Sequence, residues 1–255
     1  MLWYKSWLET RWRFVIGLGL LMFSAAATVL AYPQVLKLLP TMPPPSADGE
    51  FARRIAEAAE LMRDYRGYVW SEWFHGNMPK YWTLFAVLLG TGGLLSQVSA
   101  GGGLYTLSLP ATRTRLLTTR LMTALGQLFV LAIIPAIVVP LSSPAIGQRY
   151  SVGAALIHSA CLYIAGTVLF SLTVLLSTVF GDVWRPPLIV LCAAVVLSVA
   201  EQFSPALERY GLFRVMSAEQ YFRSGTLPWL GLLISAALSA ALLYAATRRI
   251  ARQDF

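Results

Sequence analysis

The sequence predicts an all-α membrane protein that crosses the bilayer six times. Of its 255 residues, 57% are hydrophobic and only 13% are charged, whereas soluble domains usually carry about 25% charged residues. Six apolar runs approach or reach the roughly 20 residues that a helix needs to span the hydrocarbon core. Such runs form helices because lipid offers no partner to an unpaired backbone group. We expect a single transmembrane domain over residues 1–255.

The six predicted spans are justified by the apolar runs in chain order. The first has no small-residue cleavage pattern at its end, so we interpret it as a true span and not as a signal peptide. The fourth is longer than one bilayer requires, which favours tilting, and Pro135 and Pro140 predict a kink near one end of the third. The spans are predicted at residues 14–32, 81–99, 121–141, 152–180, 187–203 and 227–246.

Three segments outside the spans have features of their own. Residues 1–13 mix aromatic, leucine and charged side chains, which is typical of an amphipathic helix lying at the inner interface. The outer loop 33–80 starts with a proline-rich stretch and continues with an apolar stripe that predicts a surface helix over residues 50–66. Residues 201–226 are short and interrupted by Pro205 and Gly211, so we expect small extracytoplasmic helices there.

Basic residues are distributed unevenly between the two sides of the predicted bundle. Both termini fall on one side, which holds ten Lys and Arg against three acidic residues; the other side holds ten against nine, in longer loops. Because cytoplasmic loops carry the excess of Lys and Arg, we expect both termini in the cytoplasm and the chain in the cell (inner) membrane. The net charge of +8 then requires no nucleic acid partner. The basic residues of the cytoplasmic side are Lys5, Arg11, Arg13, Arg113, Arg115, Arg120, Arg185, Arg248, Arg249 and Arg252.

Tryptophan and cysteine positions agree with these spans. All eight tryptophans fall near predicted span ends, as expected for aromatic belts at the two interfaces. The two cysteines, Cys161 and Cys192, fall inside apolar runs, and we interpret them as small buried hydrophobic residues. The tryptophans are Trp3, Trp7, Trp12, Trp70, Trp73, Trp82, Trp184 and Trp229.

Several chemistries lack the residues that they need. The sequence contains no G-x-x-x-x-G-K-[ST] motif, so this chain has no P-loop with which to hydrolyse ATP. With only His75 and His158, a histidine-rich metal site is not expected. His158 and Glu201 are the ionisable residues nearest to the spans, and we expect hydrogen-bonded or interfacial positions for them in preference to an ion pathway.

The most distinctive stretch is residues 99–120, which joins the second and third spans on the predicted cytoplasmic side. It contains three arginines and no acidic residue. The glycines at 101–103 can end the preceding helix, the leucines that follow offer an apolar face, and Pro110 ends that element. The positive-inside rule accounts for the arginines but not for the order Leu-Ser-Leu-Pro-x-x-Arg.

The run from Leu107 to Leu117 resembles the cytoplasmic motif of the permease subunits of type 2 ABC transporters. The layout is similar as well, with an N-terminal amphipathic helix, six spans, a sizeable first outer loop and short helices before the last span. The family often has a Glu-containing start to this segment, where this chain has Ser96-Gln-Val-Ser-Ala-Gly-Gly-Gly. The matching positions are Thr106, Leu109, Pro110, Arg113, Leu116, Leu117 and Arg120.

The resemblance implies a permease subunit, usually of an exporter, that pairs as a homodimer or heterodimer and works with separate ATPase subunits. ATP and Mg would be bound by those partners, so no cofactor is expected in this chain and it would not itself be an enzyme. The coupling segment would dock in a groove on the ATPase, where burial of a few leucines contributes several kcal/mol. The expected ATPase-coupling residues are Leu104, Leu107, Leu109, Pro110, Arg113 and Arg115.

Two other functions remain open on the sequence. One is a membrane partner that transmits force or signals, or a scaffold, without transporting anything. The other is an intramembrane enzyme, for which His75 and His158 would be the candidate residues, although no Ser-His pair has a recognisable setting in the sequence. The transported substrate is not readable, and span interiors rich in Ser, Thr and Gly weakly favour lipophilic, amphipathic or peptide-like cargo.

Overall fold

The computed structural model describes residues 2–38, 59–91, 113–180, 182–203 and 211–252. These residues form helices and connecting turns, with no β-strand among them. Four of the helices are long and apolar enough to cross a membrane. The chain is therefore an all-helical, membrane-embedded protein. The four membrane-length segments are Leu2–Leu38, Arg115–Ile146, Val152–Val179 and Trp229–Ala251.

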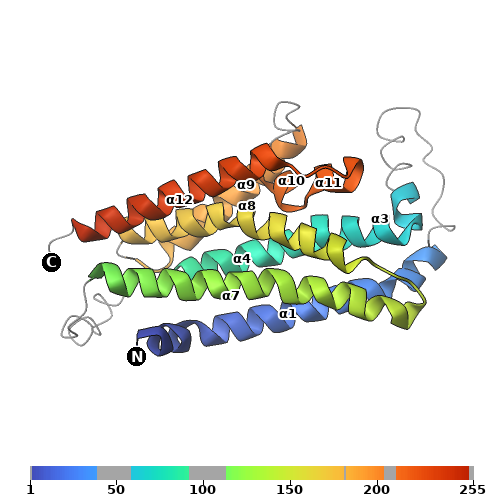
Figure 1. Cartoon of the computed structure of the whole chain (residues 1–255), viewed down its shortest axis with the longest axis horizontal. Helices are drawn as coiled ribbons and strands as arrows, with labels where there is room; N and C mark the ends of the chain where they lie inside the picture. Colours follow the sequence, from blue (N-terminus) through green and yellow to red (C-terminus); the bar gives the residue numbers. More distant parts are fainter. Residues whose placement is uncertain (1, 39–58, 92–112, 181, 204–210, 253–255) are drawn as a thin grey trace.

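The long helices lie side by side along the long axis of the molecule (Figure 1). Helix α8 is central and packs against α12, α7, α4, α10 and α9. The start of α1 and the end of α12 lie at the same end of the bundle, and the small helices α10 and α11 lie toward the other end. The α-helices are α1 (Leu2–Leu38), α3 (Tyr65–Val69), α4 (Met78–Gly90), α7 (Arg113–Ser142), α8 (Val152–Val179), α9 (Arg185–Phe203), α10 (Leu212–Met216), α11 (Glu219–Ser224) and α12 (Trp229–Ala251), with a π-helix at Trp70–Asn77 (η2) and a 3₁₀-helix at Ser143–Ile146 (η3).

Most predicted elements have a helical counterpart with shifted ends. The predicted spans 14–32, 121–141, 152–180, 187–203 and 227–246 overlap α1, α7, α8, α9 and α12 in turn. The predicted small helices between the last two spans are α10 and α11. Residues 2–13 are helical as expected, but they continue without interruption into α1 and do not form a separate helix.

The segment before the second span differs most from its prediction. Residues 65–90 run as α3, η2 and α4 in direct succession, and Tyr65, Tyr68, Trp70, Trp73 and Phe74 are buried. This part of the predicted outer loop 33–80 therefore belongs to the core. Helix α4 ends at Gly90, well before residue 99, and residues 92–99 lie outside the described part of the chain.

The predicted surface helix over residues 50–66 does not continue through Asp64. Residues 59–63 are helical, Asp64 is extended, and its Oδ2 accepts a hydrogen bond of 3.3 Å from the Gly67 backbone N–H at the start of α3. Asp is a favoured N-cap because its carboxylate satisfies an N–H that has no partner within the helix. The apolar stripe correctly indicated helical structure, but it gave no sign of the N-cap at Asp64, where a new helix, α3, begins. Residues 50–58 lie outside the described residues.

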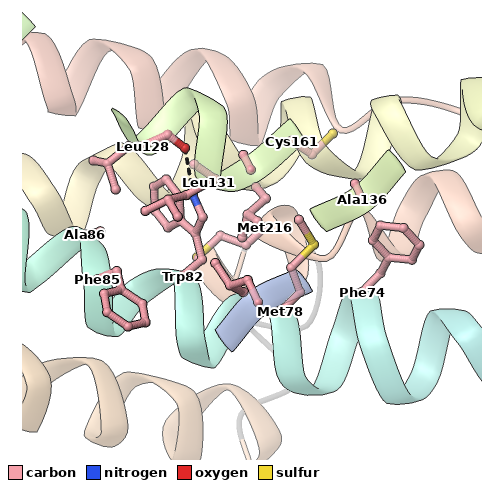
Figure 2. Packing of buried hydrophobic residues seen from close by; sticks show 14 of the residues in the cluster. Phe74, Met78, Trp82, Phe85, Ala86, Leu128, Leu131, Ala136, Cys161 and Met216 are labelled. Atoms are coloured by element: carbon pink, nitrogen blue, oxygen red, sulfur yellow. Dashed lines mark hydrogen bonds between the residues drawn. The ribbon is translucent and has the colours of Figure 1, made fainter. Parts of the chain in front are cut away.

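Trp82 of α4 packs closely against two neighbouring helices in the core (Figure 2). Its ring is fully buried, and its Nε1–H donates a 3.1 Å hydrogen bond to the Leu128 carbonyl of α7. Gly166 of α8 faces the ring so closely that a Cβ there would lie 2.9 Å from Trp82 Cε3 and Cη2. The ring thus holds α4 to α7 through a hydrogen bond. The lack of a side chain at Gly166 lets the same ring pack closely against α8.

The aromatic-belt interpretation is wrong for Trp70, Trp73 and Trp82, because all three are buried inside the bundle. Trp82 and Trp70 find carbonyl partners there, which is how a buried indole N–H is usually satisfied. The other five tryptophans are exposed, as a belt requires: Trp3, Trp7, Trp12, Trp184 and Trp229.

The interpretation of the cysteines is half right. Cys161 is buried in the same core cluster as Ala136 and Met216, whereas Cys192 is exposed on α9. An apolar run in a membrane helix does not distinguish a core-facing position from a lipid-facing one, because both favour apolar residues.

An aromatic cluster closes the end of the bundle opposite the termini. Tyr150 packs edge-on against Tyr65 and stacks on Phe74, with ring centroids 6.4 Å and 5.8 Å apart. Its hydroxyl is buried and has no hydrogen-bond partner among the described residues, whereas the Tyr65 hydroxyl lies 2.6 Å from Ser143 Oγ. Burial raises the pKa of the Tyr150 phenol, against a smaller opposing effect of Arg66.

Tyr150→Phe is expected to raise the free energy of unfolding by about 1 kcal/mol, since it removes a buried hydroxyl without a partner and keeps the ring. The matched control Tyr65→Phe, which loses a made hydrogen bond, should lower it by about 1 kcal/mol. Thermal unfolding in detergent micelles measures both changes. Equal effects of the two variants would contradict the finding that only the Tyr65 hydroxyl has a hydrogen-bond partner among the described residues.

The Tyr150 phenol also predicts a response to alkaline pH. Its raised pKa keeps it neutral in the folded state while it ionises in the unfolded state, so the unfolded state loses protons first. Stability is therefore lost as the pH rises above about 10, the ordinary tyrosine pKa. Tyr150→Phe should lose less stability than the parent protein between neutral pH and this range.

Candidate functional site

The predicted coupling residues fall almost entirely outside the described part of the chain. Leu104, Leu107, Leu109 and Pro110 lie within residues 92–112, which the structure does not describe. Arg113 is the first residue of α7, and Arg115 is exposed two residues later. What the structure does describe is how the two helices that flank this segment, α4 and α7, are held together.

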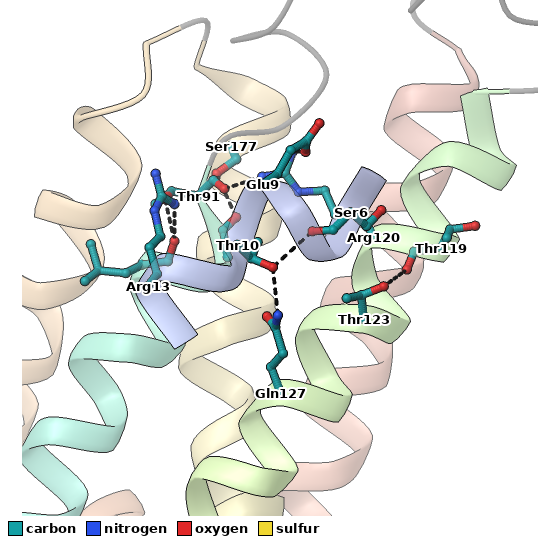
Figure 3. A network of polar contacts seen from close by, with 12 residues as sticks. Ser6, Glu9, Thr10, Arg13, Thr91, Thr119, Arg120, Thr123, Gln127 and Ser177 are labelled. Atoms are coloured by element: carbon teal, nitrogen blue, oxygen red, sulfur yellow. Dashed lines mark hydrogen bonds and ion pairs between the residues drawn. The ribbon is translucent and has the colours of Figure 1, made fainter. Parts of the chain in front are cut away.

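Two arginines hold the C-terminal end of α4 (Figure 3). Arg13 of α1 donates from Nη1 to the Leu88 carbonyl at 2.6 Å and to Thr91 Oγ1 at 2.9 Å. Arg120 of α7 donates from Nη2 to the Thr91 carbonyl at 2.6 Å. We call Arg13, Leu88, Thr91 and Arg120 the helix-end network.

The helix-end network has a clear electrostatic cause. The last carbonyls of an α-helix have no partner within the helix, and they carry the negative end of its dipole. Two guanidinium groups supply both donors and positive charge at this point, and hydrogen bonds to charged groups are stronger than neutral ones. Thr91 itself is extended, with φ −81° and ψ 162°, and its hydroxyl donates back to the Leu88 carbonyl at 2.7 Å.

Further contacts tie the same region to its neighbours. Gln127 of α7 donates from Nε2 to Thr10 Oγ1 of α1 at 2.8 Å, and both residues are buried. Arg120 lies 4.0 Å from the Glu9 carboxylate, with side chains 17% and 30% exposed. Glu9 and Arg120 thereby connect α1 to α7 on the rim of the network, where screening by water keeps an ion pair weak.

Helix α8 also contacts the end of α4. Ser177 Oγ lies 3.4 Å from the Gly90 carbonyl, while a Cβ at Gly90 would lie 3.0 Å from Thr173 Cβ. The end of α4 is thus held by α1, α7 and α8 together. Any displacement of Thr91 would be carried to three long helices, because packed interiors transmit strain.

A second polar cluster lies at the other end of the bundle, around Ser217. Its carbonyl accepts hydrogen bonds from Trp70 Nε1 at 3.3 Å and from His158 Nδ1 at 3.0 Å, and its hydroxyl lies 3.2 Å from His75 Nδ1. His158 is also stacked on Phe74, with centroids 4.6 Å apart. A carbonyl only accepts, so Nδ1 of His158 carries the proton.

The Ser217 cluster has a structural use that its geometry explains. It fixes the turn between α10 and α11, where Ala218 adopts a left-handed conformation with φ 52° and is fully buried. The pairing of Ser217 Oγ with His75 resembles a nucleophile beside a base. Ser217 is only 1% exposed, however, and its hydroxyl also donates to the Arg214 carbonyl at 3.1 Å, so a substrate does not reach it in this conformation.

Glu201 also has a structural use. Both carboxylate oxygens accept from the Phe213 backbone N–H, at 3.2 and 3.1 Å, at the start of α10. A Cβ at Gly211 would lie 2.6 Å from the Glu201 carboxylate carbon, so glycine is needed for this approach. The hydrogen-bonded position expected for His158 and Glu201 is confirmed.

Sequence reasoning missed the helix-end network and the joining of both histidines to Ser217. Arg13 and Arg120 were assigned only as positive charge on one side of the membrane, although Arg120 also matches the family motif. A Gly-Thr pair at the end of an apolar run, between two arginines on neighbouring runs, is the signal that was available. The Ser217 contacts had no such signal, because they join the turn after α10 to η2 and α8, which are far away in the sequence.

No protein-family model matches this chain, and neither a curated protein nor a solved structure matches it.

Proposed function

We propose that this chain is the permease subunit of an ATP-binding cassette transporter, with export as the expected direction, driven by a separate ATPase through residues 100–120. The observation that carries the proposal is the helix-end network, which holds both flanks of that segment. A motif that docks on an ATPase has a mechanical effect only if its flanking helices are firmly held. Here Thr91 at one flank and Arg120 near the other are joined directly.

The proposed topology has six spans with both termini in the cytoplasm. The four membrane-length helices would be completed by α9 and by the helical run that ends in α4. Exposed Arg115, Arg248, Arg249 and Arg252 lie on helix ends at the same end of the bundle, which supports this orientation. A second permease copy or a homologous permease would complete a central path, with ATP and Mg on the ATPase subunits.

Leu109→Asp or Arg113→Glu is expected to uncouple ATP hydrolysis from transport. An aspartate would place a charge in an apolar docking contact, and the glutamate would reverse the charge of the motif arginine. Nucleotide-dependent flux falls by roughly tenfold or more if a docking contact of about 1.4 kcal/mol is lost. The measurement is flux in proteoliposomes that contain the permease and its ATPase, with ATP hydrolysis followed in parallel.

The control for that experiment is Arg149→Glu, an exposed charge reversal in the turn before α8, which should leave flux unchanged. Normal flux in Leu109→Asp and Arg113→Glu, with the ATPase still bound, would refute the docking assignment. Absence of nucleotide-dependent flux in the parent protein, with the ATPase bound, would favour the second candidate function, a membrane partner that transmits ATPase-driven motion without transport.

A further inference from the structure

A groove of about 460 Å³ lies between α8 and α12 at the end of the bundle where α12 ends. Its walls are partly apolar and partly basic, with Leu175 from α8 and the rest from the last turns of α12. A neighbouring hollow of about 360 Å³ shares two of the arginines. The groove is lined by Leu175, Ala245, Arg248, Arg249 and Arg252.

The three arginines are available to an anion. All are exposed, and none of the ion pairs between described residues involves them. The Arg248 guanidinium lies 5.1 Å from the ring centroid of Tyr244, which restrains it near the groove. Basic residues in the last turn also suit the helix dipole, but that effect does not explain a groove that gathers three of them against an apolar wall.

The arginines lie at the depth of lipid headgroups. Trp229, at the start of α12, is 66% exposed, as expected for a residue at one interface. From Trp229 to Arg248 the helix rises about 29 Å at 1.5 Å per residue, which matches a hydrocarbon core of about 30 Å. Arg248 and Arg249 therefore fall at the opposite interface.

An exposed apolar stripe on α12 runs along the helix to the groove arginines. Leu230, Ile234 and Tyr244 are exposed, and they fall on the helix face that ends at Arg248. A lipid chain lying along this stripe would bring its headgroup to the arginines. Arginine suits this contact because its planar fork binds phosphate through paired hydrogen bonds.

We infer that the groove between α8 and α12 binds the phosphate of an anionic membrane phospholipid through Arg248, Arg249 and Arg252, with the acyl chain along the exposed face of α12. The site does not depend on the proposed transport function. It is formed by one chain and requires no ATPase.

The test uses the full-length protein in detergent micelles, titrated with phosphatidylglycerol or phosphatidylcholine and followed by native mass spectrometry. The parent protein should retain phosphatidylglycerol roughly tenfold or more in preference to phosphatidylcholine, and high salt should reduce the difference. The triple variant Arg248→Gln, Arg249→Gln, Arg252→Gln should lose the preference. Circular dichroism and gel filtration check that it is folded.

The matched control removes the same charge elsewhere, as Arg11→Gln, Arg115→Gln, Arg149→Gln, three exposed positions outside the groove. It should keep most of the preference. Equal loss in this control would show a general charge effect and overturn the site. Retention of phosphatidylglycerol by the groove variant would also overturn it.

Two further outcomes identify a different occupant. Displacement of phosphatidylglycerol by millimolar inorganic phosphate would indicate a site for small anions and refute the lipid assignment. If the groove variant kept its lipid but lost a co-purifying ATPase, the arginines would belong to a protein interface and the inference would fail. A groove variant that loses lipid while still binding the ATPase supports the inference.

Discussion

Gly166→Ala is expected to lower the free energy of unfolding by about 3 kcal/mol, at the upper end of the range for overpacking a core. The new methyl group would overlap Cζ3 of Trp82 and lie 2.9 Å from Cε3 and Cη2, whereas favourable carbon contacts lie at about 3.5–4.0 Å. The ring has no room to withdraw, because it is fully buried and hydrogen-bonded to the Leu128 carbonyl. Relief requires that α4 and α8 move apart.

The measurement is thermal or denaturant unfolding in micelles, with Gly126→Ala and Gly19→Ala as matched controls. Both controls are exposed helical glycines, and beyond the adjacent residues and the local helix backbone no atom of the described residues lies within 4 Å of the position that a Cβ would take. Their stability should be unchanged or higher by up to about 1 kcal/mol, the usual gain from glycine to alanine in a helix. A Gly166→Ala variant as stable as these controls would contradict the close approach of α4 and α8.

A double-mutant cycle identifies the partner. Trp82→Phe removes the part of the indole that Gly166 faces, so the two substitutions should cost less together than the sum of their separate effects, by about 1 kcal/mol or more. Additive effects would place the strain of Gly166→Ala somewhere other than Trp82.

Arg120→Met is expected to lower the free energy of unfolding by about 2 kcal/mol. It removes a charged hydrogen-bond donor and leaves the Thr91 carbonyl, at the end of α4, without that donor. Methionine keeps much of the aliphatic volume, so the change acts mainly through the lost 2.6 Å contact with the Thr91 carbonyl and the Glu9 pair. Arg120→Lys should be intermediate, because a single ammonium lacks the fork that reaches both partners.

The control for Arg120→Met is Arg115→Met, an exposed position on the same helix, which should change stability by less than about 0.5 kcal/mol. Equal effects of the two variants would mean that the helix-end network adds nothing to stability. Under the proposed function, Arg120→Met should also reduce flux more than ATP hydrolysis, because Thr91 would then move without α7. That second outcome depends on the proposal, whereas the change in stability does not.

Much of the fold could be predicted from hydropathy. The ends of α8 and α12 lie within a few residues of the predicted spans 152–180 and 227–246, because long apolar runs have no other stable conformation in lipid. The segment 65–77 was misassigned to an outer loop. Its Arg66, Glu72 and His75 lower the local hydropathy, yet the aromatic residues between them are buried.

Less of the candidate site could be predicted. The motif around Leu109 and Arg113 was identified from residue order, but its docking role remains a prediction, and most of it lies outside the described residues. Of the arginines that hold the end of α4, Arg13 had been interpreted only as topological charge, and Arg120 as topological charge and as a position of the motif. Residue order does not show which carbonyl a guanidinium reaches, since Arg13 and Leu88 are 75 positions apart.

The sequence by itself determined that this protein is helical and membrane-embedded, because the free energy of transferring apolar side chains and satisfying the backbone depends on local composition. Tertiary structure alone decided which apolar residues face the core. It placed Trp82 against Gly166, exposed Cys192, and brought Arg13 and Arg120 to the end of α4. These contacts join distant segments of the chain, so they depend on how the helices pack and not on any one helix.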